Sequence, residues 1–135
     1  MIYAHKTCWK HHTAKKETPW GHEIVWAALT GVHGKLIFIK KNHSTSLKFF
    51  DRKDEVIFVR RGRIKINWGD SSFVKEQFPE EYFENVLKQG DSFCVQAGCP
   101  YRITALSNAE IIEIGSCSNS SFTRLYDDYG RDVDG

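Results

Sequence analysis

The stretch VIFVRRGRIKINW, residues 56–68, predicts two β-strands joined by a tight turn. Residues 56–59 are apolar and mostly β-branched, Arg61-Gly62 supplies the turn, and residues 63–68 alternate polar and apolar side chains as a half-buried strand does. We therefore expect these two strands to form a hairpin. Similar segments, separated by Gly, Asn and Asp, lie on both sides of it. The predicted strands are residues 22–29, 34–41, 45–50, 55–60, 63–68, 92–96, 101–106, 109–116 and 121–125.

One segment departs from the strand pattern. From Phe78 to Leu87 the apolar residues recur at helical spacing, Pro79 and two glutamates suit a first turn, and Gly90 can end a helix. We expect a short helix over residues 79–88 that connects two halves of a β-rich domain. Many short strands in one small domain indicate an all-β sandwich or jelly-roll barrel. The expected organisation is an N-terminal arm (1–17), a barrel (18–131) and a C-terminal tail (132–135).

Length and charge narrow the functional classes. The 135 residues suit one domain that is large enough to bury a core. The net charge of +2 is spread along the chain, which disfavours a nucleic-acid partner, because such binding depends on a concentrated basic surface. No apolar run reaches the roughly 20 residues that cross a membrane, and the first residues lack the features of a secretory signal. We expect a cytoplasmic protein with neither a nucleic-acid nor a membrane partner.

Cysteines and N-terminal histidines give no convincing metal motif. The cysteines lie far apart without Cys-x-x-Cys spacing, so free thiols are expected at Cys8, Cys94, Cys99 and Cys117. Cys94, in an apolar strand, reads as a small buried hydrophobic residue. A metal could be held by His5, Cys8, His11 and His12, but no second ligand cluster follows, so a solvated arm is favoured. An arm that crosses to a partner subunit is the alternative.

Short motifs along the chain carry a family resemblance. In order they are Thr18-Pro19-Trp20-Gly21-His22-Glu23, Gly34-Lys35, Ser46-Leu47-Lys48, Lys53-x-Glu55, Gly90-Asp91, Gly98-x-Pro100-x-Arg102, Glu113 and Arg124-Leu125-x-Asp127-Asp128-Tyr129-Gly130-Arg131. Over residues 17–131 the sequence resembles the cupin domain of type II mannose-6-phosphate isomerases and related short single-domain cupins. The resemblance implies a double-stranded β-helix, or jelly-roll barrel, and an aldose–ketose interconversion. In metal-dependent members a divalent ion held by histidines and a glutamate stabilises the developing oxyanion.

The metal-ligand positions implied by this resemblance are altered. They fall on Phe50, Arg52, Glu55 and Tyr101, so only the glutamate remains. Phenylalanine cannot ligate, arginine is a permanent cation, and tyrosine is a poor ligand at neutral pH. We therefore expect no metal and no other cofactor at this site. His33 and His43 read as solvated turn residues, although a metalloenzyme that uses them through an altered register is a third alternative.

The substitutions themselves suggest a different site. Strand periodicity places Ser46, Lys48 and Phe50 on one face, so if Phe50 points into the barrel, Lys48 does too. With Glu55 and Tyr101 this gives a cation, a carboxylate and a phenol. The predicted catalytic residues are Lys48, Glu55 and Tyr101, and the predicted substrate-binding residues are Phe50, Arg102 and Arg124. The alternative is a filled barrel without a pocket, in which Glu55 pairs with Lys48 or Lys53.

The function expected from these residues is recognition of a sugar phosphate or nucleotide sugar by a homodimeric cupin. If the protein is an enzyme, a sugar-phosphate isomerase or epimerase is expected, with Glu55 or Tyr101 moving the proton and Lys48 and Arg102 stabilising the enolate. A non-catalytic module that binds or senses a small molecule is the alternative from another class.

Overall fold

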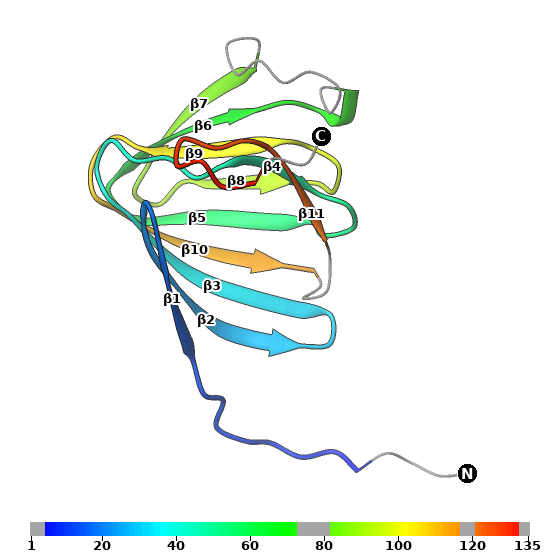
Figure 1. Cartoon of the computed structure of the whole chain (residues 1–135). Coiled ribbons are helices and arrows are strands. Elements are labelled where there is room, and N and C mark those ends of the chain that lie inside the picture. The colour runs from blue at the N-terminus through cyan, green and yellow to red at the C-terminus, as the bar shows by residue number, and fades with distance from the viewer. Residues whose placement is uncertain (1–4, 73–81, 117–120, 133–135) are drawn as a thin grey trace.

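The computed structural model describes residues 5–72, 82–116 and 121–132. Two antiparallel sheets face each other, with strand orders β1-β2-β3-β10-β5-β8 and β11-β4-β9-β6-β7 (Figure 1). The strands are β1 Ala14–Thr18, β2 Gly21–Leu29, β3 Val32–Ile39, β4 Leu47–Phe50, β5 Glu55–Arg61, β6 Arg63–Trp68, β7 Phe83–Lys88, β8 Ser92–Val95, β9 Tyr101–Ala105, β10 Ala109–Gly115 and β11 Phe122–Tyr126. All nine predicted strands are present, each within two residues of its predicted bounds. The all-β jelly-roll prediction is confirmed.

The predicted hairpin of β5 and β6 is wrong, although both strands exist. β5 pairs with β10 and β8, whereas β6 pairs with β9 and β7, so the turn at Gly62 carries the chain from one sheet to the other. Gly62 has a φ of 81°, and a Cβ there would lie 2.4 Å from the Asn108 carbonyl oxygen. The turn therefore fits against the start of β10, and both edges of β5 are used by strands distant in sequence.

The helix predicted over 79–88 is also wrong where the structure describes it. Phe83–Lys88 form β7, which pairs antiparallel with β6 from Trp68↔Phe83 to Arg63↔Lys88. Pro79 lies outside the described residues, and no α-helix occurs in the described ranges. The apolar spacing of this short segment fits either element, and β6 has a free edge that a strand can satisfy. Aromatic and β-branched residues such as Phe83 and Val86 also favour the strand.

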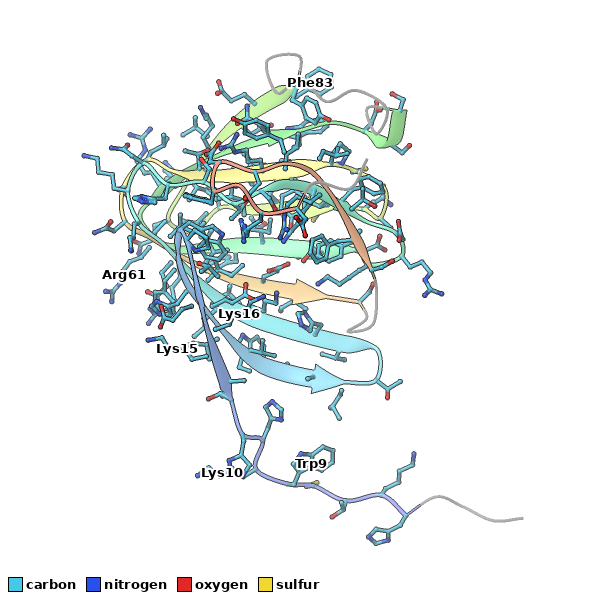
Figure 2. All side chains as sticks on the ribbon, in the orientation of Figure 1. Trp9, Lys10, Lys15, Lys16, Arg61 and Phe83 are labelled. Atoms are coloured by element: carbon cyan, nitrogen blue, oxygen red, sulfur yellow. The ribbon has the colours of Figure 1, made fainter. Side chains whose placement is uncertain are left out.

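Part of the expected N-terminal arm belongs to the sheet. Ala14–Thr18 form edge strand β1 against β2, while residues 5–13 extend away from the barrel (Figures 1 and 2). Trp20 then anchors the turn in the core, where its side chain is buried. The next residue must be glycine, because its backbone passes so close to Phe38 that a Cβ at Gly21 would lie 2.0 Å from the Phe38 carbonyl oxygen.

The main core lies between the two sheets. Its fully buried members come from alternate positions of β3, β5, β6, β9 and β10 and are mostly isoleucine and valine. A second apolar cluster, Leu47, Phe49, Tyr82 and Leu125, covers the opposite face of β4. Strand β4 is thus enclosed on both faces, which leaves Lys48 and Phe50 to face the barrel interior.

Three of the four cysteines lie in the described residues. Cys8 and Cys94 are exposed free thiols and Cys99 is partly buried. The expectation that Cys94 is buried is wrong, because β8 is an edge strand whose residues Phe93 and Val95 face the core, which leaves Cys94 on the exposed face. Cys117 lies outside the described residues. The described ranges contain no helix with the length and apolar character needed to span a membrane.

Candidate functional site

A cavity of about 210 Å³ lies at one end of the barrel, between the β1–β3 side of the six-stranded sheet and the β4–β11 side of the other. It is polar and mostly basic. Its lining residues are Lys16, Thr18, Trp20, Glu23, His33, Lys35, Thr45, Ser46, Lys48, Phe50, Lys53, Phe122, Arg124 and Arg131. Six of these are lysine or arginine, and only Glu23 is acidic.

Strand alternation explains how the polar side chains enter the barrel. On β4, Lys48 and Phe50 share the inner face, as predicted. On β3, His33 and Lys35 occupy the same face as the core residues Ile37 and Ile39. His33 is buried, so the expectation of a solvated turn residue is wrong. His33 lies two residues before Lys35 and four before Ile37, so strand periodicity alone would have placed its side chain inside the barrel.

A buried carboxylate organises the floor of this region. The Tyr101 hydroxyl donates a hydrogen bond of 2.7 Å to Glu55 Oε1, and Lys53 Nζ lies 3.3 Å from Glu55 Oε2. Burial and the adjacent Glu55 charge raise the pKa of Tyr101 well above its ordinary value, so the phenol keeps its proton. Lys53 and Glu55 form an ion pair but not a hydrogen bond, since Glu55 Oε2 has no hydrogen-bond partner among the described residues. The predicted trio is therefore only partly assembled: Glu55 and Tyr101 meet, while Lys53 takes the place expected for Lys48.

The same lysine reaches His33. Lys53 Nζ lies 3.4 Å from His33 Nδ1, and because an ammonium only donates, Nδ1 is the acceptor and the ring proton sits on Nε2. Burial lowers the pKa of His33, and the positive charges of Lys53 and Lys35 lower it further. His33 is therefore neutral at neutral pH. The contact between Lys53 and His33 was not predicted from the sequence. Lys53 lies in the loop after β4, where no strand periodicity indicates which way its side chain points.

Lys48 has a different environment from the other interior lysines. Lys35 pairs with Glu23 at 3.3 Å and Lys53 pairs with Glu55, but Lys48 makes no ion pair and no hydrogen bond within the described residues. Its Nζ instead lies over two aromatic rings, 5.4 Å from the centre of Phe50 and 5.2 Å from that of Phe122. Burial, followed by the nearby Lys35 charge, lowers the pKa of Lys48 to about 8.

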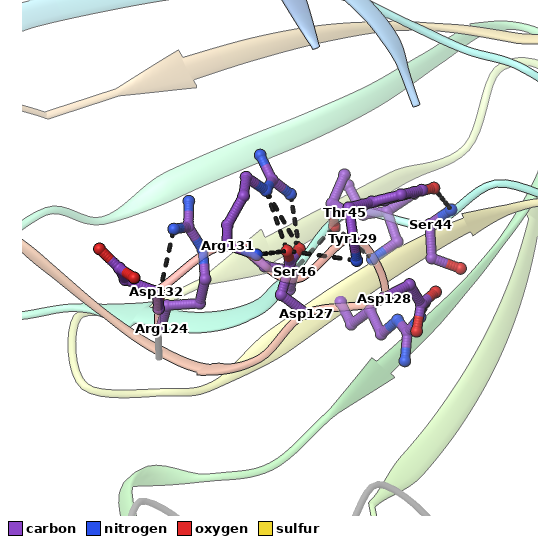
Figure 3. Close-up of polar contacts among 11 residues, drawn as sticks. Ser44, Thr45, Ser46, Arg124, Asp127, Asp128, Tyr129, Arg131 and Asp132 are labelled. Carbon is purple, nitrogen blue, oxygen red and sulfur yellow. Dashed lines mark hydrogen bonds and ion pairs between the residues drawn. The ribbon is translucent and has the colours of Figure 1, made fainter. Parts of the chain in front are cut away.

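The C-terminal motif supplies Arg131 to the cavity lining, and Figure 3 shows the polar contacts that hold this motif in place. The Asp127 carboxylate accepts hydrogen bonds from the backbone of Tyr129 and Arg131 and two-pronged bonds from the Arg131 guanidinium. Burial alone would raise the pKa of Asp127, but the hydrogen bonds from Arg131 outweigh it and lower the pKa. The Tyr129 hydroxyl accepts a hydrogen bond from the Ser44 backbone, which holds the tail against the sheet. Arg124, on β11, donates to the Asp132 carbonyl at 3.3 Å.

Glu55 and Tyr101 lie next to the cavity but do not line it, and Arg102 and His43 lie further from it. Arg102 lies on the outer face of β9, where it pairs with Asp128 and stacks over Tyr126. Tyr101 and Arg102 are neighbours on one strand, so they cannot both face the barrel. His43 bonds the Lys41 carbonyl and stacks on Tyr129, outside the cavity.

The donor set does not suit the divalent ion of metal-dependent cupins. Of the implied ligand positions, Phe50 offers no donor, Arg52 is exposed, and Tyr101 is a protonated phenol already bonded to Glu55. The Lys53 ammonium lies between Glu55 and His33, the two groups that would otherwise ligate. Among the described residues, no three His, Cys, Asp or Glu side chains cluster at metal-binding distance. The residues at these positions therefore do not fit a divalent ion.

Two larger cavities lie elsewhere on the protein and lack this concentration of buried charged side chains. One, of about 370 Å³, lies at the β2–β3–β10 end near His22, Phe38 and Arg61, and the other, of about 320 Å³, lies between the arm and Trp26. Both are lined mainly by apolar atoms. The smaller basic cavity is the one that brings buried charged groups together.

Comparisons with known proteins support the fold. No family model and no curated protein matches the sequence. KdgF from Halomonas sp. superposes with a TM-score of 0.65 at 14% identity, covering 81% of this chain and 90% of KdgF. A mutant of Bacillus subtilis oxalate decarboxylase gives a TM-score of 0.70 at 18% identity, covering 84% of this chain and 30% of that chain. Procruciferin, an 11S globulin from Brassica napus, gives 0.65 at 15% identity, covering 82% and 28%.

These structural neighbours are cupins, and at such low identity the likeness shows the fold alone. The predicted cupin fold is confirmed. The narrower resemblance to mannose-6-phosphate isomerases gains no support from them. The chain spans less than a third of the oxalate decarboxylase and globulin chains, and nearly all of KdgF.

Proposed function

We propose that the basic cavity binds a small organic anion, with a sugar phosphate or sugar acid as the ligand class. The observation that carries the proposal is the six-to-one excess of basic over acidic residues in its lining. Lysine and arginine at a partly enclosed site bind phosphate and carboxylate groups with charge-assisted hydrogen bonds. Aromatic rings such as Phe50 and Phe122 suit the C–H faces of a sugar.

The size of the cavity favours a small ligand within this class. At about 210 Å³ it is smaller than the 300–1,000 Å³ typical of sites for drug-sized ligands. A sugar phosphate is therefore favoured over the nucleotide sugar considered from the sequence. Oxalate, named in one structural neighbour, is also a small anion, which is consistent with this class.

Binding is favoured over isomerisation as the primary role. Glu55 and Tyr101 bond each other beneath the cavity and are not among its lining residues, and Arg102 lies outside the barrel. The proton-transfer scheme expected from the sequence would require Glu55 to leave Tyr101 and Lys53 and reach the ligand. An isomerase or epimerase remains the second candidate because Glu55 is the family-implied glutamate and lies close to this cavity through Lys53.

Thermal shift with matched ligands tests the proposal. The panel is mannose 6-phosphate, glucuronate, glycerol 3-phosphate and oxalate, with mannose and glycerol as uncharged controls. A ligand at one hundred times its dissociation constant stabilises a protein by about 2.7 kcal/mol. We expect stabilisation by at least one anion, its loss in Lys48→Met, and its retention in the exposed control Lys88→Met. No stabilisation by any anion, or equal stabilisation by the uncharged parents, would refute the proposal. Turnover of the stabilising sugar then separates an enzyme from a binding module.

The homodimer and the cytoplasmic location stay predictions. The outer face of the six-stranded sheet exposes Val56, Phe58 and Ile114, and Val56 lies directly opposite Ile114 in the strand register. Light scattering decides the oligomeric state, with a molar mass of twice 15.6 kDa expected.

A further inference from the structure

We propose that Lys48 is a nucleophile that forms an imine with the carbonyl group of an anionic aldehyde or ketone bound in the cavity. The inference rests on the proposed function for its ligand class, but it adds a covalent step that anion binding does not require. Lys48 lies between Tyr101 on β9 and Arg124 on β11 in the strand register and lines the cavity directly.

The partners of the interior lysines single out Lys48. Carboxylates hold Lys35 and Lys53 at 3.3 Å each, so their nitrogens are fixed as ammonium groups in ion pairs. Lys48 faces aromatic rings and has no acceptor within the described residues. An amine that is exposed to a cavity but not tied to a carboxylate is the arrangement that nucleophilic lysines use.

The surrounding charges favour the neutral, nucleophilic amine. The groups that face Lys48 from the surrounding elements are Lys16, Glu23, His33, Lys35, Lys53, Glu55, Tyr101, Arg124 and Arg131. Burial and the Lys35 charge outweigh the opposing effects of Glu55 and Glu23, and the pKa falls to about 8. At pH 7.5 roughly a quarter of such an amine is neutral, against roughly 0.1% for an ordinary lysine. Lysines next to other cations are activated in the same way.

The reaction balances without any other reagent. The neutral Lys48 nitrogen forms a bond to the carbonyl carbon, and the carbonyl oxygen leaves as water together with both amine hydrogens. The product is the imine, which takes up one proton to become the iminium. The anionic group of the ligand would meet Arg124 or Arg131, which line the same cavity as Lys48. An iminium withdraws electrons from the neighbouring carbon more strongly than the carbonyl it replaces.

Reductive trapping tests the inference on the wild-type protein. The probes are glyceraldehyde 3-phosphate and glyoxylate, each with cyanoborohydride, and the uncharged control is glyceraldehyde. Peptide mapping then measures labelling at each of the chain's twelve lysines. We expect labelling at Lys48 at least ten-fold above that at exposed Lys88, rising with pH to a midpoint near 8. Lys48→Arg should remove the dominant label, and Lys88→Arg should leave it unchanged.

Separate outcomes distinguish the imine from the binding proposal. If glycerol 3-phosphate stabilises the wild-type protein but Lys48 is labelled no faster than Lys88, the imine proposal is overturned and anion binding stands. If glycerol 3-phosphate and the other anions fail to stabilise the protein, the binding proposal fails. Selective labelling by the anionic probes over uncharged glyceraldehyde supports both, and it needs no variant to fold.

Discussion

Inside the barrel the Lys53 ammonium lies 3.3 Å from the Glu55 carboxylate, with side chains only 5% and 1% exposed. Tyr101 donates to the same carboxylate and His33 accepts from the same ammonium. The barrel therefore contains a closed polar network next to its isoleucine-rich core. Removing one partner of such a buried ion pair is costly, because the remaining charge is left desolvated and unpaired. This holds even where the intact pair adds little net stability.

Lys53→Met should destabilise the protein by about 3–5 kcal/mol, because it leaves the buried Glu55 carboxylate without its cation. Adding Glu55→Gln to Lys53→Met should recover part of this loss. Urea unfolding measures both effects. Lys65→Met is the matched control, since Lys65 pairs with the exposed Glu84 at 3.5 Å and should cost less than about 1 kcal/mol. Equal losses for Lys53→Met and Lys65→Met would contradict the network.

Tyr101→Phe should cost about 1–3 kcal/mol, because it removes the one hydrogen bond that Glu55 Oε1 accepts within the described structure. Tyr126→Phe, at a largely exposed position over Arg102, should change the unfolding free energy by less than about 0.5 kcal/mol. Chemical denaturation of both variants makes the comparison. A neutral Tyr101→Phe would mean that the phenol is not bonded to the carboxylate.

Lys48→Met should stabilise the protein at pH 7 while it abolishes anion binding. Folding lowers the pKa of Lys48 from 10.5 to about 8, so below pH 8 the folded state carries the full cost of a desolvated ammonium. The destabilising contribution of Lys48 should therefore disappear between pH 8 and pH 10.5. We expect Lys48→Met to be more stable by about 1–3 kcal/mol at pH 7, with the difference shrinking towards pH 10.5.

Urea unfolding at pH 7 and pH 10 tests this dependence, with Lys88→Met as the control for the loss of an exposed lysine. A Lys48→Met variant that is less stable at pH 7, or whose advantage is independent of pH, would show that Lys48 is not a desolvated cation.

Gly21→Ala should cost about 4 kcal/mol or prevent folding, because the added Cβ would lie 2.0 Å from the Phe38 carbonyl oxygen. Gly31→Ala is the matched control. Its φ of 82° also favours glycine, but nothing lies within 4 Å of the added Cβ, so about 1 kcal/mol is expected. Thermal unfolding ranks the two variants. A similar cost for both would mean that backbone conformation, and not close approach, requires Gly21.

Local patterns predicted the strands well but not their partners. The alternation in residues 63–68 located β6 to the residue, whereas its pairing with β7 and β9 depends on residues that are 15 to 41 positions away, from Trp68↔Phe83 to Ile64↔Ala105. A turn at Gly62 is compatible with a hairpin or with a corner between sheets, and only the long-range pairing decides. The 83–88 segment was assigned wrongly for the same reason, since its apolar spacing fits either element.

The site was predictable as far as strand alternation extends. The shared inner face of Lys48 and Phe50 followed from period two, and the same rule applied to β3 and β9 would have placed His33 inside and Arg102 outside. Pairing of Glu55 with Lys53 was one of two alternatives from the sequence, and it is the one the structure shows. The sequence could not choose between Lys53 and Lys48, because the direction of Lys53 is set by the loop that follows β4 and by the space left at Gly115. A Cβ at Gly115 would lie 3.0 Å from the Lys53 side chain.

Calorimetric titration of the wild-type protein with mannose 6-phosphate, against mannose, at pH 7 and pH 9 tests the central claim most directly. The phosphate keeps its full charge across this range, since its second pKa is near 6, so any change reports on the protein. Because Lys48 loses its proton near pH 8, we predict binding of the phosphate at pH 7, about ten-fold weaker binding at pH 9, and no binding of mannose. Binding that is equal at both pH values and unaffected by Lys48→Met, or equal binding of mannose, would contradict the account.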